Sequence, residues 1–106
     1  MLVRLTYLNA LPERVEDIKK IYYGEIVPAV KKQPGCLDVM LLEPVNVAEE
    51  FISCTMWQTQ ADAEAYESSG TYQEMLDKVK GLLSKVPVLK SYEAAEVAKR
   101  QVSYSA

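Results

Sequence analysis

The chain has 106 residues, 49% of them hydrophobic and 25% charged, with 12 basic and 15 acidic side chains and a formal net charge of −3. This length predicts one domain with one core, and the acidic balance argues against nucleic acid as a partner. The absence of histidine removes the commonest general base and the histidine-dependent catalytic triads. No apolar run reaches the roughly 20 residues of a membrane span, and no signal peptide begins at Met1. The sequence therefore predicts a cytoplasmic protein without a membrane partner.

The two cysteines, Cys36 and Cys54, are too few and too far apart for a metal site. If they lie on adjacent antiparallel strands joined by a loop near Asn46, Cys54 faces Met40 and Cys36 lies four residues further along. At about 3.3 Å per residue this is about 13 Å, which is beyond the reach of a disulfide. We interpret both as small buried hydrophobic residues, and a reactive thiol stays open as the alternative.

The first predicted elements are a strand over residues 2–8 and a long helix that follows it. The helix opens at Pro12, where the missing N–H does no harm, and ends at Pro34–Gly35. Its buried stripe consists of Val15, Ile18, Tyr22, Ile26 and Val30. Pro28 lies inside the helix, and its ring would meet the carbonyl of Gly24, so we expect one kinked helix and not two.

Two further strands are predicted over residues 36–43 and 51–57, joined as a hairpin. Thr59, three residues before Asp62, is typical of a capping box and starts a short helix to about residue 67. Thr71 and Glu74 repeat the spacing and start the next helix. That helix is expected to bury Tyr72, Met75, Leu76, Val79, Leu82 and Leu83. A last strand over 86–92 completes a domain of residues 1–93, and 94–106 form a tail that we expect to dock on a partner subunit.

This order predicts an α+β, ferredoxin-like βαββαβ fold, with a four-stranded antiparallel sheet and helices on one face. The two middle strands are apolar on both faces. In one, Leu37, Val39 and Leu41 oppose Cys36, Met40 and Leu42, and in the other, Phe51 and Trp57 oppose Ile52, Cys54 and Met56. Because the helices cover only one face, the other predicts a homodimer through the sheet. The alternative is a twisted sheet that curls over itself.

Three segments resemble the antibiotic biosynthesis monooxygenase superfamily of dimeric α/β barrels, over about residues 1–92. The segment 26–36 (IVPAVKKQPGC) is similar to its quinol monooxygenase branch. The pair Met56–Trp57, with Ala61, Ala65 and Tyr66 after it, resembles the family's third strand and short helix. The segment 68–72 (SSGTY) opens the next helix in the same way.

The resemblance implies a cavity between the helices and the sheet and a monooxygenase activity that needs no cofactor. Family members that degrade haem use an asparagine on the first strand, a tryptophan and a histidine on a helix. Here these positions fall on Thr6, on Trp57 and near Leu76. Since no histidine supplies the usual axial ligand, haem degradation is disfavoured.

Electron-rich quinols and phenols react with oxygen once deprotonated, so the protein must bind a flat aromatic anion and exclude water. We expect Trp57 and Thr6 to be catalytic, and the substrate-binding residues to be Arg4, Tyr22, Tyr23, Tyr66 and Tyr72. Arg4 would neutralise the anion. No side chain stands out as a general base, and neither a metal nor a cofactor is expected.

Each candidate also has a structural interpretation. Trp57, Tyr22 and Tyr72 fit core packing, Arg4 fits a salt bridge at a sheet edge, and the lysines at 78, 80 and 85 fit a solvated face. The leading hypothesis is a homodimeric monooxygenase acting on a small quinol or polyphenol. The second is a non-catalytic dimer that binds a small ligand or acts in a stress response, because this fold serves many functions.

Overall fold

The structure is a computed structural model that describes residues 1–95. Its strands are β1 (Leu2–Leu8), β2 (Cys36–Leu42), β3 (Phe51–Trp57) and β4 (Val88–Glu93), and its helices are α1 (Val15–Ile21), α2 (Val27–Lys31), α3 (Gln60–Ser68) and α4 (Thr71–Val79). Short helical turns, η1 (Pro12–Arg14), η2 (Tyr22–Ile26) and η3 (Lys80–Leu82), extend α1, α2 and α4. The order confirms the predicted ferredoxin-like fold.

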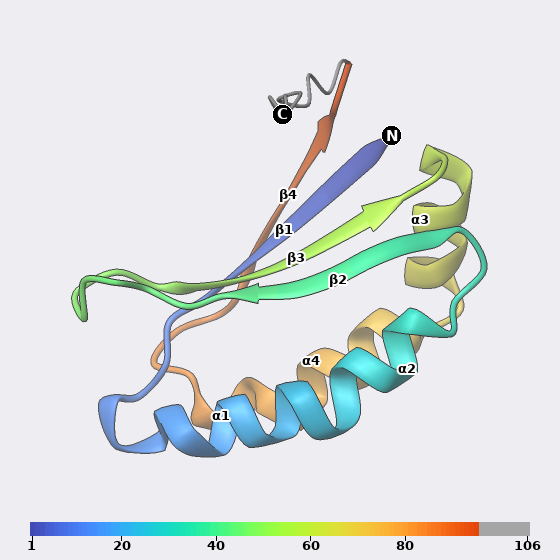
Figure 1. Ribbon diagram of the computed structural model, residues 1–106. Coiled ribbons are helices and arrows are strands. Elements are labelled where there is room, and N and C mark those ends of the chain that lie inside the picture. The colour runs from blue at the N-terminus through green and yellow to red at the C-terminus, as the bar shows by residue number, and fades with distance from the viewer. Residues whose placement is uncertain (96–106) are drawn as a thin grey trace, which may run out of the picture.

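The four strands form one sheet in the order β2-β3-β1-β4, and every neighbouring pair is antiparallel. All the helices of residues 1–95 lie on one side of this sheet (Figure 1). Side chains of β1 alternate strictly, with Leu2, Arg4, Thr6 and Leu8 buried under the helices. Phe51 and Trp57 of β3 lie beside them, as predicted, so the core fills the space between the sheet and the helices.

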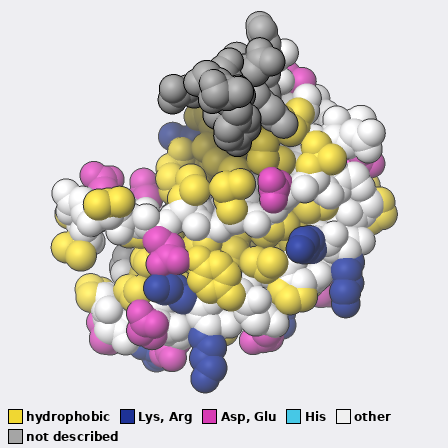
Figure 2. Space-filling model, viewed as in Figure 1, with side chains coloured by type: hydrophobic (Ala, Val, Ile, Leu, Met, Phe, Trp, Pro, Cys, Tyr) yellow, Lys and Arg dark blue, Asp and Glu magenta, His cyan; other side chains and the backbone are white. Residues whose placement is uncertain are grey.

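The opposite side of the sheet, which we call the open face, is largely apolar. It consists of Val3, Leu5, Tyr7, Met40, Leu42, Ile52, Cys54, Met56, Val88 and Tyr92, with Asp38 and Lys90 among them. Met40, Leu42, Val88 and Tyr92 are all more than one-third exposed. Apolar side chains gather above the strands in Figure 2. No described helix covers this face, so the apolar pattern on both sides of the sheet is confirmed.

One part of the predicted face pattern is wrong. A β-bulge lies between Cys36 and Asp38, so Cys36 pairs with Trp57 and packs against the core, whereas Leu37 is 54% exposed. The extra residue in β2 reverses which side of the sheet the side chains before the bulge face. Met40 pairs with Cys54 as predicted. The thiols of Cys36 and Cys54 are both free. Burial raises the pKa of each thiol, which keeps it in the unreactive neutral form.

The long helix absorbs Pro28 through a π-helical turn at Tyr22–Ile26, in which the Val27 N–H donates to the Tyr22 carbonyl five residues back. The helical run is therefore continuous from Val15 to Lys31, as predicted, and includes a wider turn just before Pro28. Ile18, Tyr22, Ile26 and Val30 are all buried at a spacing of four residues. In a regular α-helix this spacing drifts by about 40° per step. The wider turn offsets part of that drift and keeps the stripe on the sheet.

The two predicted capping boxes have different outcomes. Thr59 accepts a hydrogen bond from the Asp62 N–H and donates one to the Asp62 carboxylate at 2.8 Å, as expected. The Thr71 cap is wrong, because Gly70, with φ of 88°, is the residue that precedes α4 and Thr71 is already helical. The hydroxyl of Ser69 accepts a hydrogen bond from the Thr71 N–H. Glycine reverses the chain between the two helices because it tolerates positive φ.

The end of the domain also differs from the prediction in detail. The helix stops at Val79, and Leu83 forms an isolated bridge with Ala10. The last strand begins at Val88 and not at residue 86, since Pro87 has no N–H for a ladder. Residues 96–106, most of the predicted docking tail, lie outside the described residues. Among residues 1–95 no helix is long and apolar enough to span a bilayer.

Candidate active site

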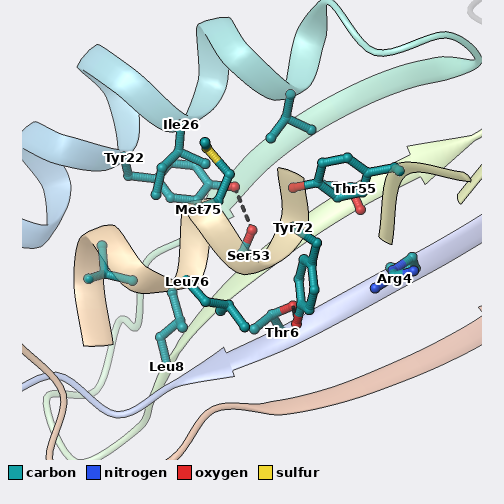
Figure 3. Close-up of a pocket in the computed structure, with 13 residues that line it drawn as sticks. Arg4, Thr6, Leu8, Tyr22, Ile26, Ser53, Thr55, Tyr72, Met75 and Leu76 are labelled. Carbon is teal, nitrogen blue, oxygen red and sulfur yellow. Dashed lines mark hydrogen bonds between the residues drawn. The ribbon is translucent and has the colours of Figure 1, made fainter. Parts of the chain in front are cut away.

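A small cavity of about 30 Å³ lies between the sheet and the helices (Figure 3). It is lined by Arg4, Thr6 and Leu8 of β1, Ser53 and Thr55 of β3, Tyr22, Ile26 and Val30 of the long helix, Tyr66 of α3, and Tyr72, Met75, Leu76 and Val79 of α4. This volume holds about one or two water molecules. The polar groups of the cavity are Arg4, Thr6, Ser53 and Thr55 from the sheet and the hydroxyls of Tyr22, Tyr66 and Tyr72 from the helices, and the other lining residues are apolar.

Arg4 is the only cationic side chain among the residues that line this cavity, and it is 4% exposed. Its guanidinium donates to the Ala63 carbonyl at 3.3 Å and to the Glu67 carboxylate at 3.1 Å, and it lies 4.9 Å from the centre of the Tyr72 ring. Glu67 is half exposed, so water weakens this ion pair. Arg4 thus points inward and also forms a salt bridge, but β1 is an inner strand and the partner lies on α3, so the predicted position of this salt bridge at a sheet edge is wrong.

Three hydroxyl groups lie beside Arg4. Thr6 Oγ1 and the Tyr72 hydroxyl are 3.0 Å apart, joining β1 to α4. The Tyr66 ring meets the Tyr72 ring edge to face, with centroids 5.9 Å apart. Within residues 1–95 the Tyr66 hydroxyl has no hydrogen-bond partner, so it is free to bind a ligand. Burial raises the pKa of Tyr66 well above its ordinary value, and this keeps the hydroxyl a donor.

Tyr22 forms a second polar group further along the cavity. Its hydroxyl donates to the Met40 carbonyl at 3.1 Å and lies 2.7 Å from Ser53 Oγ (Figure 3). Because a carbonyl only accepts, both bonds form together when Ser53 donates to Tyr22. Burial raises the pKa of Tyr22 to about 12. The ring is fixed by these bonds and packs in the core, so Tyr22 is a fixed wall of the cavity.

Trp57 does not line the cavity. It is completely buried, its indole N–H donates to Thr55 Oγ1 at 2.9 Å, and its ring stacks on Tyr66 with centroids 4.9 Å apart. The indole N–H is therefore occupied, and Trp57 contacts the cavity through Thr55 and Tyr66. Its catalytic role stays a prediction, and a positioning role fits this geometry.

Tyr23 lies outside the cavity. It is 49% exposed, and its hydroxyl donates to Glu43 at 2.6 Å, while Lys19 pairs with the same carboxylate at 2.9 Å. The bonds from Tyr23 and Lys19 lower the pKa of Glu43. The structure thus brings together five of the predicted site residues, Arg4, Thr6, Tyr22, Tyr66 and Tyr72, and separates Tyr23 and Trp57 from them.

Sequence reasoning missed Ser53 and Thr55, which share the core face of β3 with Phe51 and Trp57. A signal for them was present in the sequence, because a polar residue on the buried face of a strand indicates a polar site in the core. Arg4 and Thr6 on β1 give the same signal. Met75 and Val79 are buried as predicted, but only the docking of α4 places them beside the cavity. Leu76, near the position where the resemblance implies a histidine, lines the cavity with an apolar side chain.

The residues present do not fit haem. No histidine exists in the chain, and the observed cavity is far smaller than a porphyrin. Within residues 1–95, no three histidine, cysteine or acidic side chains gather as a metal site. The described site combines one cationic side chain, Arg4, with several hydroxyl groups in otherwise apolar surroundings.

The chain is thus a ferredoxin-like domain, with a four-stranded antiparallel sheet, helices on one side of it and a small cavity between the two layers. Residues 1–78 match the family model described as antibiotic biosynthesis monooxygenase. The chain therefore belongs to the antibiotic biosynthesis monooxygenase family. No curated protein sequence matches it.

Solved structures share the fold at low sequence identity. A candidate antibiotic biosynthesis monooxygenase from Deinococcus radiodurans is 19% identical, with a TM-score of 0.81, and covers 96% of this chain and 100% of its own. Its counterpart from Nitrosomonas europaea is 18% identical, with a TM-score of 0.77, and covers 91% of this chain and 100% of its own. A haem degrader from Mycobacterium tuberculosis, solved with two haems in its active site, is 17% identical, with a TM-score of 0.77. It covers 93% of this chain and 100% of its own.

Proposed function

We propose that this protein is a cofactor-independent monooxygenase that oxidises a small quinol or polyphenol with molecular oxygen. The observation that carries the proposal is Arg4, a nearly buried cation that lines an apolar cavity beside Thr6, Tyr66 and Tyr72. A cation with hydroxyl donors in a dry site stabilises a phenolate far better than water does. Membership of the family supports a monooxygenase reaction.

The chemistry needs the substrate anion and little else. A deprotonated ring carbon transfers an electron to oxygen, and the two radicals combine into a peroxide at that carbon. Protonation and loss of water then leave a carbonyl, so that the CH₂ form of the substrate and O₂ give C=O and H₂O. Arg4 holds the anion, while Tyr66 and Tyr72 donate hydrogen bonds to its oxygens.

The cavity must widen before an aromatic ring can bind. At about 30 Å³ it is smaller than the roughly 150 Å³ cavity that accepts benzene. Tyr72 and Leu76 are the half-buried side chains of the lining on α4, and Tyr22 and Ile26 of the wide turn line the same cavity. Rotation of Tyr72 breaks one hydrogen bond to Thr6, and a ligand hydroxyl can replace that bond.

We also propose that two copies of the chain pair through the open face. Four apolar side chains on that face, Met40, Leu42, Val88 and Tyr92, are more than one-third exposed in the single chain, and a monomeric protein rarely exposes a large apolar patch. A twofold pairing buries the same residues of both subunits.

The cytoplasm is the expected location from the sequence. The rival function is a non-catalytic dimer that binds a small aromatic ligand in the same cavity.

Oxygen uptake decides between these functions. The purified protein is incubated under air with a panel of reduced naphthoquinols and polyphenols, beside Arg4→Gln and the surface control Lys31→Gln. We expect wild type and Lys31→Gln to consume oxygen above the uncatalysed rate, and Arg4→Gln to lose roughly a hundredfold in kcat/KM. Binding of the oxidised quinone without oxygen uptake by any substrate would favour the non-catalytic dimer.

A further inference from the structure

A groove of about 430 Å³ lies on the outside of the domain, between α4 with η3 and the segment that leads to β4. It is lined by Gln73, Leu76, Lys80, Leu83, Ser84, Lys85, Val86 and Pro87. The groove is separate from the interior cavity, but Leu76 lines both of them. One half-buried leucine is thus the wall shared by the proposed active site and an external surface of ligand size.

One wall of this groove is held by the backbone. The Leu11 N–H donates to the Leu82 carbonyl at 2.9 Å, and the Ser84 N–H donates to the Asn9 carbonyl at 2.7 Å. Leu83 lies between these two bonds and forms a bridge with Ala10. Because the wall is preformed, a ligand loses little free energy in ordering it.

The chemistry of the groove is apolar along its length and positive at its rim. Leu76, Leu83 and Pro87 are half-buried, and Val86 is 82% exposed although it is apolar. Lys80 and Lys85 line the same groove, and no acidic residue does. Lys80 pairs with Asp77 at 3.1 Å, whereas Lys85 has no ion pair within residues 1–95. Lys85 therefore offers the more available positive charge, in a net acidic protein.

We infer that the substrate of the cavity carries an apolar side chain that passes Leu76, lies in this groove and ends in an anionic group at Lys85 and Lys80. This inference rests on the proposed site, since it deepens the substrate class from a small quinol to a substituted one. Arg4 then holds the phenolate of the ring, and the lysines hold the far end of the substituent. The apolar stem would cover Val86, which is 82% exposed among the described residues.

The test measures binding and turnover separately. The single tryptophan, Trp57, stacks on Tyr66 of the cavity wall, so its fluorescence reports quinone binding without any reaction. The probes are a plain 1,4-naphthoquinone and naphthoquinones whose alkyl side chains of increasing length end in a carboxylate. Lys85→Glu is compared with Lys31→Glu, which makes the same charge change at the end of α2, away from the groove.

Wild type is expected to bind a carboxyalkyl quinone of matching chain length more tightly than the plain quinone. Lys85→Glu should raise the Kd of the carboxylated probe about five- to tenfold, with the plain quinone unchanged, and Lys31→Glu should change neither. Equal Kd values of both probes in wild type, or a Lys85→Glu effect on both alike, would overturn the inference. Charge-dependent binding of the probes without oxygen uptake would instead refute the proposed monooxygenase reaction and leave the inference about the groove intact.

Discussion

The hydroxyl of Tyr72 lies 3.0 Å from Thr6 Oγ1, and this one hydrogen bond joins α4 to the central strand β1 beside the cavity. A hydrogen bond of this kind contributes about 1 kcal/mol to folding. Tyr72→Phe and Thr6→Val should each lower the free energy of unfolding in urea by about that amount. The double variant should lose clearly less than the sum of the two. Strict additivity would show that the two side chains do not interact.

Trp57 should matter more for stability than for contact with the substrate. Trp57→Phe removes the indole hydrogen bond to Thr55 and part of the stacking on Tyr66, so we expect a loss of about 2 kcal/mol in urea unfolding. Because the indole does not line the cavity, kcat/KM should fall by less than in Arg4→Gln. A fall in kcat as large as that of Arg4→Gln, in a variant of unchanged stability, would instead make Trp57 a catalytic residue.

The buried tyrosines should destabilise the protein at alkaline pH. The pKa of Tyr22 is about 12 in the folded chain, against an ordinary value of 10.0, because burial disfavours the phenolate. Between these values the folded chain holds the proton more tightly than the unfolded chain, so the stability present below pH 10 is lost as the pH rises to 12. The loss is on the order of 2 kcal/mol. Unfolding in urea at several pH values should show that the free energy of unfolding falls less steeply with pH in Tyr22→Phe than in wild type. Identical pH dependences would contradict this role of Tyr22.

Two glycines with positive φ should respond differently to alanine. Gly35 has φ of 80°, and a Cβ there would lie only 2.6 Å from Asp62 Cβ, whereas nothing lies within 4 Å of a Cβ at Gly70 (φ 88°). Gly70→Ala should cost about 1–2 kcal/mol of backbone strain, and Gly35→Ala should cost more. Gly24→Ala, in helical backbone with open space around it, should not destabilise. Thermal unfolding of the three variants checks the ranking, and equal losses at 35 and 70 would refute the contact with Asp62.

The open face should control assembly. Met40 is 37% exposed on that face, so Met40→Lys places a charge in the proposed interface without disturbing the core. We expect wild type to elute as a dimer and Met40→Lys to shift toward a monomer in light scattering at equal concentration. Val45→Lys, at a fully exposed position in the β2–β3 connection, is the matched control and should stay dimeric. A monomeric wild type would refute pairing through the sheet.

Local patterns in the chain were enough to predict the strands at 2–8 and 51–57, the cap at Thr59, and the apolar character of both sides of the sheet. These features follow from the period of two in strands and from the hydrogen bonds of one residue to its near neighbours, which do not depend on the rest of the fold. The family resemblance, which the family model confirms, rested on three segments of the same local kind.

Other features arise only when distant segments meet. The bulge at Leu37 moved Cys36 to the core face, because pairing with β3 and not local pattern sets the register. Trp57 and Tyr23 have suitable chemistry, yet the packing of Tyr66 and the position of Glu43 separate them from the cavity.

Sequence by itself determined the fold class, the apolar sheet and a set of candidate side chains, because each depends on residue type and spacing. Only the tertiary structure decided that Arg4, Thr6, Tyr66 and Tyr72 share one cavity and that Leu76 separates it from an outer groove. The physical reason is that a cavity is the space left by the packing of β1, β3, α3 and α4, segments up to about 70 residues apart, and no local preference encodes that packing.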